Sequence, residues 1–291
     1  MGNTVKTAFL LTLLTLILIW IGGHFGGRNG LILGFLFAAG MNFFTYFYSD
    51  KLALKMYNAQ PVTREQLPRA YAVVERMTQR MGIPMPKMYV IPTDSPNAFA
   101  TGRNPKHASV AMTQGILALL NDEELEGVLA HELGHVQNRD ILTSSIAATL
   151  AGAITLIARM GYWASLFGGY GSGGQGSSSE RGGGLSSLFM LIVAPIAAML
   201  IQLAVSRSRE YEADATGART TGNPYALASA LEKIDAYSKR LPMVASPSSA
   251  HLFIAQPFVG GGMLTNLFST HPPMAKRIER LIGRKSITGL E

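Results

Sequence analysis

The amino-acid sequence predicts a mainly α-helical protein with a small antiparallel β-sheet and four transmembrane helices. Three observations support this fold class. Hydrophobic residues make up 48% of the 291-residue chain, which is high for a soluble protein. The apolar residues gather in four long segments, and two short β-like runs lie between the second and the third segment. A strongly patterned helix follows the second of these runs.

Composition also narrows the range of functions. The chain has no cysteine, which excludes disulfides and zinc sites with cysteine ligands. A net charge of +7 could indicate a nucleic-acid-binding protein, but the basic residues are scattered and no basic run is interleaved with aromatic residues. We therefore expect no nucleic-acid partner, because the positive-inside bias of a membrane protein explains the charge better.

Residues 1–49 predict a transmembrane hairpin. Two uncharged apolar spans, at about residues 7–21 and 31–48, are separated by a glycine-rich break. The connecting loop carries only Arg28 as a charged residue. Four basic residues follow the second span: Lys51, Lys55, Arg64 and Arg69. The positive-inside rule therefore predicts that the N-terminus and the residues after Ser49 lie in the cytoplasm.

Residues 50–140 predict the first part of a cytoplasmic domain. Their polarity is mixed, and residues 64–81 show helical periodicity. Short β-like runs at 88–91 and 108–112 lie on either side of a turn-rich segment. These runs indicate a small, mainly antiparallel sheet that leads directly into the next helix.

That helix carries the most specific motif of the chain, because His131, Glu132 and His135 form an H-E-x-x-H pattern. Two histidines four residues apart leave a helix from nearly one face and can bind a single ion. Glu132 is turned about 100° from His131, which places it to reach an attacking water molecule. Asn121 or Asp122 can cap the helix. Its other faces are apolar, and two buried histidines need a partner such as a metal.

Residues 141–205 predict a second transmembrane hairpin. Its arms are the apolar runs 141–163 and 185–205, and the Gly/Ser-rich loop 168–184 connects them. A buried core helix is the alternative for the first arm, because threonine and serine are frequent in it. Two passes return the chain to the side of the motif helix, so residues 206–291 are predicted to form the second part of the cytoplasmic domain.

The charged stretch after the fourth apolar run contains candidates for a third metal ligand. Catalytic zinc takes three protein ligands, and a His-His-Glu set is one known combination. Glu210 or Glu212 can complete it. Asp214 lies on the face of Glu210, where its carboxylate could accept a hydrogen bond from a ligating histidine, and this companion favours Glu210. The alternative is that the whole stretch is a solvated, charged helix end.

Taken together, these motifs resemble those of the HtpX-type heat-shock membrane zinc metalloproteases, which are gluzincins related to the CAAX prenyl proteases. Besides the H-E-x-x-H motif and the four apolar segments, the resemblance rests on Asn97-Ala98-Phe99, Glu210-Tyr211-x-Ala213-Asp214, Ala250-His251-Leu252-Phe253 and Phe268-Ser269-Thr270-His271-Pro272-Pro273. It implies an α+β zincin-type catalytic domain assembled from residues 50–140 and 206–291.

The resemblance also implies a role for each matching residue. One Zn²⁺ per chain would be bound by His131, His135 and Glu210. Glu132 would be the general base, and Asp214 would orient a ligating histidine. The segment Asn97, Ala98 and Phe99 would be an edge strand that binds an extended substrate by main-chain hydrogen bonds. His271 would either stabilise the transition state or have a structural role.

We therefore expect a multi-pass, zinc-dependent endopeptidase of the cytoplasmic (inner) membrane, with its active site facing the cytoplasm. Its partners would be the lipid bilayer and its substrates, which are misfolded or damaged membrane proteins or unfolded polypeptides, in stress-related protein quality control. The alternative is a catalytically silent membrane scaffold in which zinc only ties the helices together. Glu132 argues against the scaffold, because a structural site has no use for a carboxylate beside an open coordination position.

Overall fold

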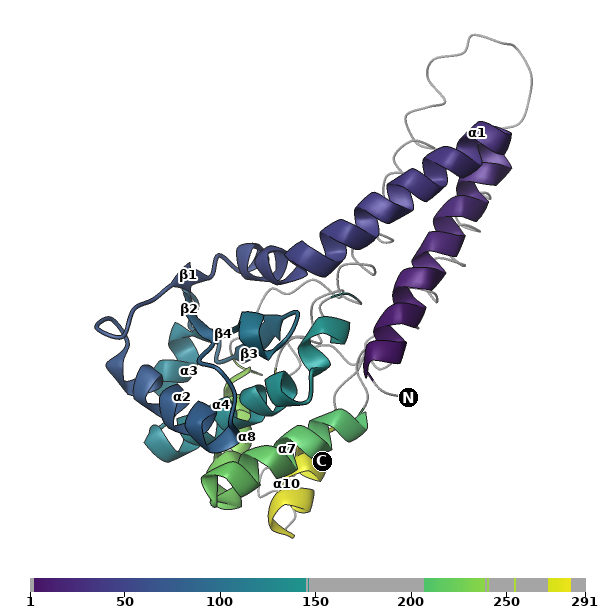
Figure 1. Ribbon diagram of the computed structural model, residues 1–291. Helices are drawn as coiled ribbons and strands as arrows, with labels where there is room; N and C mark the ends of the chain where they lie inside the picture. Colours follow the sequence, from purple (N-terminus) through teal and green to yellow (C-terminus); the bar gives the residue numbers. More distant parts are fainter. Residues whose placement is uncertain are drawn as a thin grey trace, which may run out of the picture.

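The computed structural model describes residues 3–144, 146, 207–238, 240, 254 and 272–283. These residues form a helical hairpin that projects from a domain in which helices pack on a small sheet (Figure 1). Most of the predicted second hairpin, including the loop 168–184 and the arm 185–205, lies outside the described residues. His271 lies outside them as well.

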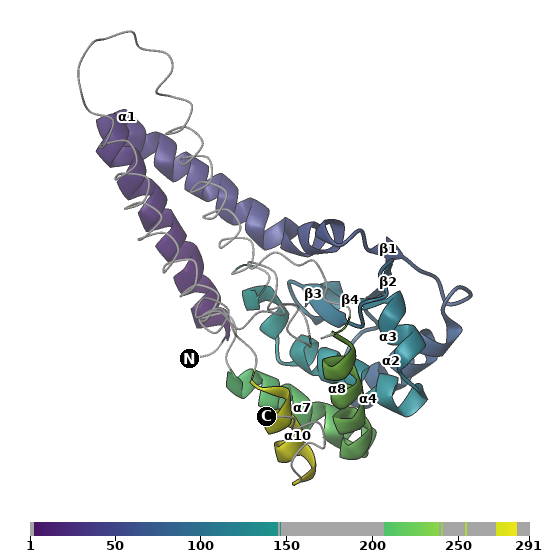
Figure 2. The ribbon, with the colours of Figure 1, turned by 180° about the vertical axis from the view of Figure 1, so that it is seen from behind.

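The projecting hairpin is α1 (Asn3–Met56), which doubles back at a kink (Figures 1 and 2). Gly27 makes the kink with φ 55° and ψ −140°, a left-handed backbone that favours glycine. The two arms approach closely, since a Cβ atom on Gly30 would lie 1.9 Å from the carbonyl oxygen of Gly22. Any larger residue at these two positions would therefore force the arms apart.

No helix in the described part of the chain is, as a single straight element, both long enough and apolar enough to cross a membrane. The helices Gly26–Phe44 and Tyr46–Met56 meet that requirement only as a pair bent by 62°, and Thr7–Trp20 is a shorter apolar helix.

In the described part of the chain, four short strands form one mixed sheet in the order β1-β2-β4-β3. They are β1 (Gln60–Pro61), β2 (Lys87–Ile91), β3 (Ala98–Gly102) and β4 (Ala108–Thr113). The outer pairs are antiparallel, but β2 and β4 run parallel. The prediction of an antiparallel sheet is therefore wrong for the central pair. The reason is that β3 lies at the outer edge of the sheet and runs antiparallel to β2. The chain then turns back in a hairpin, so β4 lies between β3 and β2 and runs in the same direction as β2.

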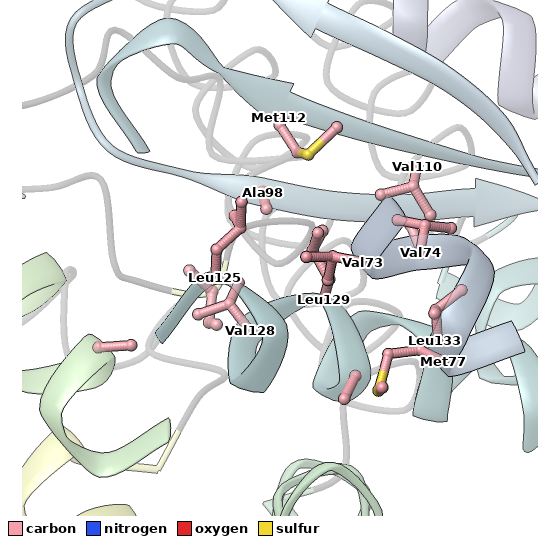
Figure 3. Packing of buried hydrophobic residues seen from close by; sticks show 14 of the residues in the cluster. Val73, Val74, Met77, Ala98, Val110, Met112, Leu125, Val128, Leu129 and Leu133 are labelled. Carbon is pink, nitrogen blue, oxygen red and sulfur yellow. The ribbon is translucent and has the colours of Figure 1, made fainter. Parts of the chain in front are cut away.

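The motif helix α4 (Asp122–Gln137) lies at the centre of the domain. It contacts α2 (Pro68–Met81), α7 (Arg207–Thr221), α8 (Pro224–Ser238) and the strand β3. The short α3 (Gln114–Leu119) precedes it, and α10 (Met274–Ile282) packs on α7 and α8 (Figure 2). The core forms where α4 meets α2 and the sheet (Figure 3), and it includes Val73, Val74, Met77, Ala98, Val110, Met112, Leu125, Val128, Leu129 and Leu133.

Local sequence sets where α4 begins. Asn121 is its N-cap: the Asn121 side chain accepts from the backbone N–H of Glu124, and the Glu124 side chain accepts from the backbone N–H of Asn121. Ser229 and Lys233 of α8 donate to the same Glu124 carboxylate at 2.6 and 2.8 Å. Burial would raise the pKa of Glu124, but these hydrogen bonds lower it overall. The cap therefore starts α4 and also ties it to α8.

Small residues allow α7 to lie directly against α4. A Cβ atom on Gly217 would be only 3.1 Å from the backbone nitrogen of His131, and one on Gly134 would be 3.5 Å from Ala213. Glu210 and Asp214 precede Gly217 by seven and three residues, so they share its face of the helix. The close packing at Gly217 therefore turns both carboxylates toward the motif histidines.

Candidate metal centre and active site

Two helices bring three possible metal ligands together. Ligand atoms of His131, His135 and Glu210 all lie within 4.8 Å of one another. The Nε2 atoms of His131 and His135 are 3.7 and 3.5 Å from the two carboxylate oxygens of Glu210. The two imidazole rings stand nearly perpendicular, at an interplanar angle of 88°. Three donors thus converge on one small space from α4 and α7.

Glu210 and Glu212 differ sharply in their surroundings. The Glu210 side chain is buried against both histidines, whereas Glu212 is exposed. The two residues point about 200° apart on a helix, so only one can face the cluster. The structure brings Glu210 to the histidines and leaves Glu212 at the surface.

A carboxylate stands behind each histidine. The Nδ1 atom of His131 lies 2.9 Å from Asp214, and the Nδ1 atom of His135 lies 3.2 Å from Asp140. A proton on Nδ1 that is donated to these carboxylates leaves Nε2 of each ring free to bind a metal. Asp214 was predicted for such a role, but Asp140 was not. In the sequence, Asp140 could have been noticed only as an acidic residue five positions after His135.

A buried arginine, which the sequence analysis did not single out, holds Asp214. Arg277 of α10 is fully buried and donates to both Asp214 oxygens, through Nε at 2.9 Å and Nη2 at 2.6 Å. Burial would raise the pKa of Asp214, but Arg277 and His131 lower it to about 2. The sequence offered little reason to expect a buried Arg277, since an arginine next to Ile278 in a short amphipathic helix is normally at the surface.

Glu132 is the third member of the motif and also lies in the buried cluster. Its Oε2 atom accepts a hydrogen bond from the backbone N–H of Ala100 in β3 at 3.0 Å. Burial raises the pKa of Glu132 to about 7, and the nearby Glu210 adds to this effect. A carboxyl group with such a pKa can both accept and donate a proton near neutral pH.

The charges of the cluster fit a divalent cation. Its described residues include two guanidinium groups, of Arg209 and Arg277, and four carboxylates: Glu132, Asp140, Glu210 and Asp214. With neutral histidines and all four carboxylates ionised, as metal binding requires, the formal charge is −2. Although burial would lower the pKa of His135, the surrounding carboxylates raise it to about 9. The site therefore attracts positive charge, and two imidazoles with one carboxylate are donors that suit zinc.

The segment predicted to bind substrate lies at the sheet edge. Among the described strands, β3 pairs with β4. The side chains of Ala98 and Phe99 are buried, and Phe99 contacts Tyr57 with ring centroids 5.9 Å apart. Asn97 is buried too, and its Oδ1 atom accepts from the backbone N–H of Ile254 at 3.1 Å. The three side chains of this segment are therefore packed within the protein.

The fold and the site define a class of protein. A helix with two histidines four residues apart, a glutamate from a second helix and a motif glutamate beside an edge strand form the arrangement of a metallopeptidase.

Comparisons with known proteins lead to the family. A family model described as peptidase family M48 matches residues 64–285, and the chain belongs to this family. It is therefore a metalloprotease, and the resemblance read from its motifs is confirmed.

Individual relatives are similar over nearly the whole chain. A protein named "Protease HtpX homolog" from Desulforapulum autotrophicum is 54% identical and covers 97% of this chain and 90% of the relative. Proteins of the same name from Desulfatibacillum aliphaticivorans and Thermococcus sibiricus are 53% and 49% identical, covering 99% and 97% of this chain and 92% and 96% of the relatives.

The fold is also found among solved structures. The crystal structure of S. mikatae Ste24p aligns with a TM-score of 0.52 and 21% sequence identity, covering 96% of this chain. The chain spans 65% of the length of that protein.

Proposed function

We propose that the protein is a zinc-dependent endopeptidase of the cytoplasmic (inner) membrane. Its substrates are misfolded or damaged membrane proteins, which it cleaves on the cytoplasmic side as part of the stress response. The observation that carries the proposal is the buried cluster of His131, His135 and Glu210 with Glu132 beside it. The name shared by the relatives supports the proteolytic part of the proposal.

The residues of the cluster divide the chemistry among them. Zinc, when bound by His131, His135 and Glu210, supplies a Lewis acid that acidifies water and polarises the scissile carbonyl. Glu132 accepts the proton of the attacking water and later donates it to the leaving amine. The N–H of Ala100 holds one oxygen of this carboxylate and so orients it.

An unfolded substrate fits the edge strand. A peptide that adds to β3 must be extended over several residues, because strand pairing uses main-chain N–H and C=O groups at strand spacing. Folded segments do not present such a backbone. Selection for extended chain at β3 would therefore direct cleavage to damaged or unfolded proteins.

The hairpin α1 supports a place in the membrane. Its arms expose large apolar side chains, among them Leu16, Trp20, Ile32, Leu33, Phe35, Leu36, Phe37 and Phe43. An apolar surface of this kind indicates contact with lipid or with other apolar helices. We propose that α1 and the apolar runs 141–163 and 185–205 together anchor the catalytic domain, with residues 50–140 and 206–291 in the cytoplasm.

Removal of the metal tests the catalytic proposal. Detergent-purified protein should cleave an unfolded membrane-protein substrate, lose this activity in excess chelator, and regain it when zinc is restored. The measurement is the amount of fragment formed in each condition. Cleavage that persists without metal would show that the proposed mechanism is wrong. Zinc-loaded protein without any cleavage would favour the catalytically silent scaffold.

Cysteine labelling tests the topology. The native chain has no cysteine, so a single Ser177→Cys substitution in the predicted loop reports without background. We expect a membrane-impermeant thiol reagent to label this variant in intact cells or spheroplasts from outside. As a control, a cysteine introduced at exposed Lys87 should react only after the cytoplasmic side is opened. The reverse pattern would contradict the four-span arrangement.

A further inference from the structure

A continuous path of hydrogen bonds connects the edge strand with the metal centre. Asn97, just before β3, accepts from the N–H of Ile254 at 3.1 Å, and the C=O of Ile254 accepts from Nη1 of Arg277 at 3.2 Å. Arg277 then holds Asp214, which lies 2.9 Å from Nδ1 of His131. All five residues are at most 3% exposed. The path joins segments that are up to 180 residues apart in the chain.

We propose that Arg277 is a positioning residue of the metal centre: it orients His131 through Asp214 and is itself tied to the edge strand β3 through the backbone of Ile254. This inference rests on the proposed zinc-dependent function. It adds a residue from the C-terminal helix α10 to a site that otherwise comes from α4 and α7.

The geometry requires an arginine and not merely a positive charge. Nε and Nη2 bind the two oxygens of Asp214 side by side, while Nη1 points to the carbonyl of Ile254. A planar guanidinium group offers these donors in one rigid fork, whereas an ammonium group is a point charge without such a fork. Lysine at this position could balance the charge of Asp214 but could not hold its plane and bind Ile254 as well.

Arg277 also faces two of the three candidate ligands directly. Its Nη2 atom lies 3.4 Å from each ring nitrogen of His131, and its Nη1 atom lies 3.7 Å from Oε2 of Glu210. Arg277 therefore lies beside both candidate ligands as well as behind Asp214.

The next arginine on the same helix provides a matched control. Arg280 lies three residues later, is exposed, and stacks over the ring of Tyr211 at 4.5 Å. Both arginines line one pocket of about 410 Å³ between α7, α8 and α10. Arg280→Lys therefore makes the same chemical change in the same pocket without touching the path to His131.

The test is the zinc affinity of the full-length, detergent-purified protein, measured by competition with a chromophoric chelator. Arg277→Lys should bind zinc on the order of 10–100-fold more weakly than the wild type, the loss typical of groups behind a ligand. Its Co²⁺-substituted form should show a changed visible absorption spectrum, because the ligand geometry changes. Arg280→Lys should match the wild type in both measurements.

A double-mutant cycle tests whether Arg277 acts through Asp214. If it does, Asp214→Asn combined with Arg277→Lys should lose no more zinc affinity than Asp214→Asn alone, whereas independent roles would give additive losses. If Arg277→Lys fails to fold, Asn97→Ala tests the inference in its place. This variant removes the acceptor of the Ile254 N–H and should weaken zinc binding several-fold.

Three outcomes would overturn the inference. The first is an unchanged zinc affinity and Co²⁺ spectrum in folded Arg277→Lys, and the second is additive losses of zinc affinity in the double-mutant cycle. The third applies if Arg277→Lys does not fold, and it is an unchanged zinc affinity in Asn97→Ala. A wild-type protein that binds no zinc would instead overturn the proposed function and this inference together. The two failures are therefore distinguishable in one series of measurements.

Discussion

Glu132→Gln is expected to abolish peptide hydrolysis while the protein keeps its zinc. Glutamine preserves the shape of the side chain and can still accept from the N–H of Ala100, but it cannot take the proton of the attacking water. Loss of a general base typically costs about 10²–10⁴-fold in rate. Turnover of an unfolded substrate and metal content per chain are the two measurements.

Glu123→Gln is the control for this experiment. Glu123 lies in the first turn of the same helix and is exposed, and within the described part of the chain it accepts a hydrogen bond from the Asn223 side chain at 3.2 Å. This variant should cleave like the wild type. If Glu132→Gln cleaves at a near-normal rate, Glu132 is not the general base.

The second large effect is expected at the metal ligands. Glu210→Ala should lose most of its zinc, because the proposed ligand set is then reduced to two histidines and catalytic zinc takes three protein ligands. Glu210 is buried and its oxygens lie 3.7 and 3.5 Å from the two Nε2 atoms. Metal content after purification, together with chelator competition, measures this loss.

Substitutions of two neighbours on the same helix should reduce zinc binding less than Glu210→Ala does. Asp214→Ala should weaken zinc binding by about 10–100-fold, as expected for a residue that orients a ligand. Glu212→Ala should leave the zinc content almost unchanged, since Glu212 is exposed on the other side of α7. Loss of metal in Glu212→Ala with retention in Glu210→Ala would refute the ligand assignment.

Much of the candidate site was predictable because the position of a side chain around a helix depends only on its spacing from nearby residues. Spacing alone puts His131 and His135 on one helical face and Glu132 on another. The same argument pairs Glu210 with Asp214 on α7. The sequence left Asn121 and Asp122 as candidates for the N-cap of α4. The structure shows that Asn121 is the cap, through its reciprocal hydrogen bonds with Glu124.

The sheet shows where local rules stop. Alternation and turn signals locate the runs that become β2 and β4, but they carry no information about the direction in which two strands pair. That direction depends on β3 lying outside β4, which is a fact about the arrangement in space. The central pair was therefore predicted incorrectly as antiparallel.

The sequence by itself determined the class of chemistry, the four apolar segments and the candidate ligands, because each rests on composition or on a spacing of a few residues. Only the tertiary structure brought Asp140 to His135 and Arg277 to Asp214, and only it connected Ile254 to Asn97. The physical reason is burial. An arginine or an aspartate in a polar stretch reads as a surface residue until packing removes it from water, and a buried charge must then be paired within the folded protein.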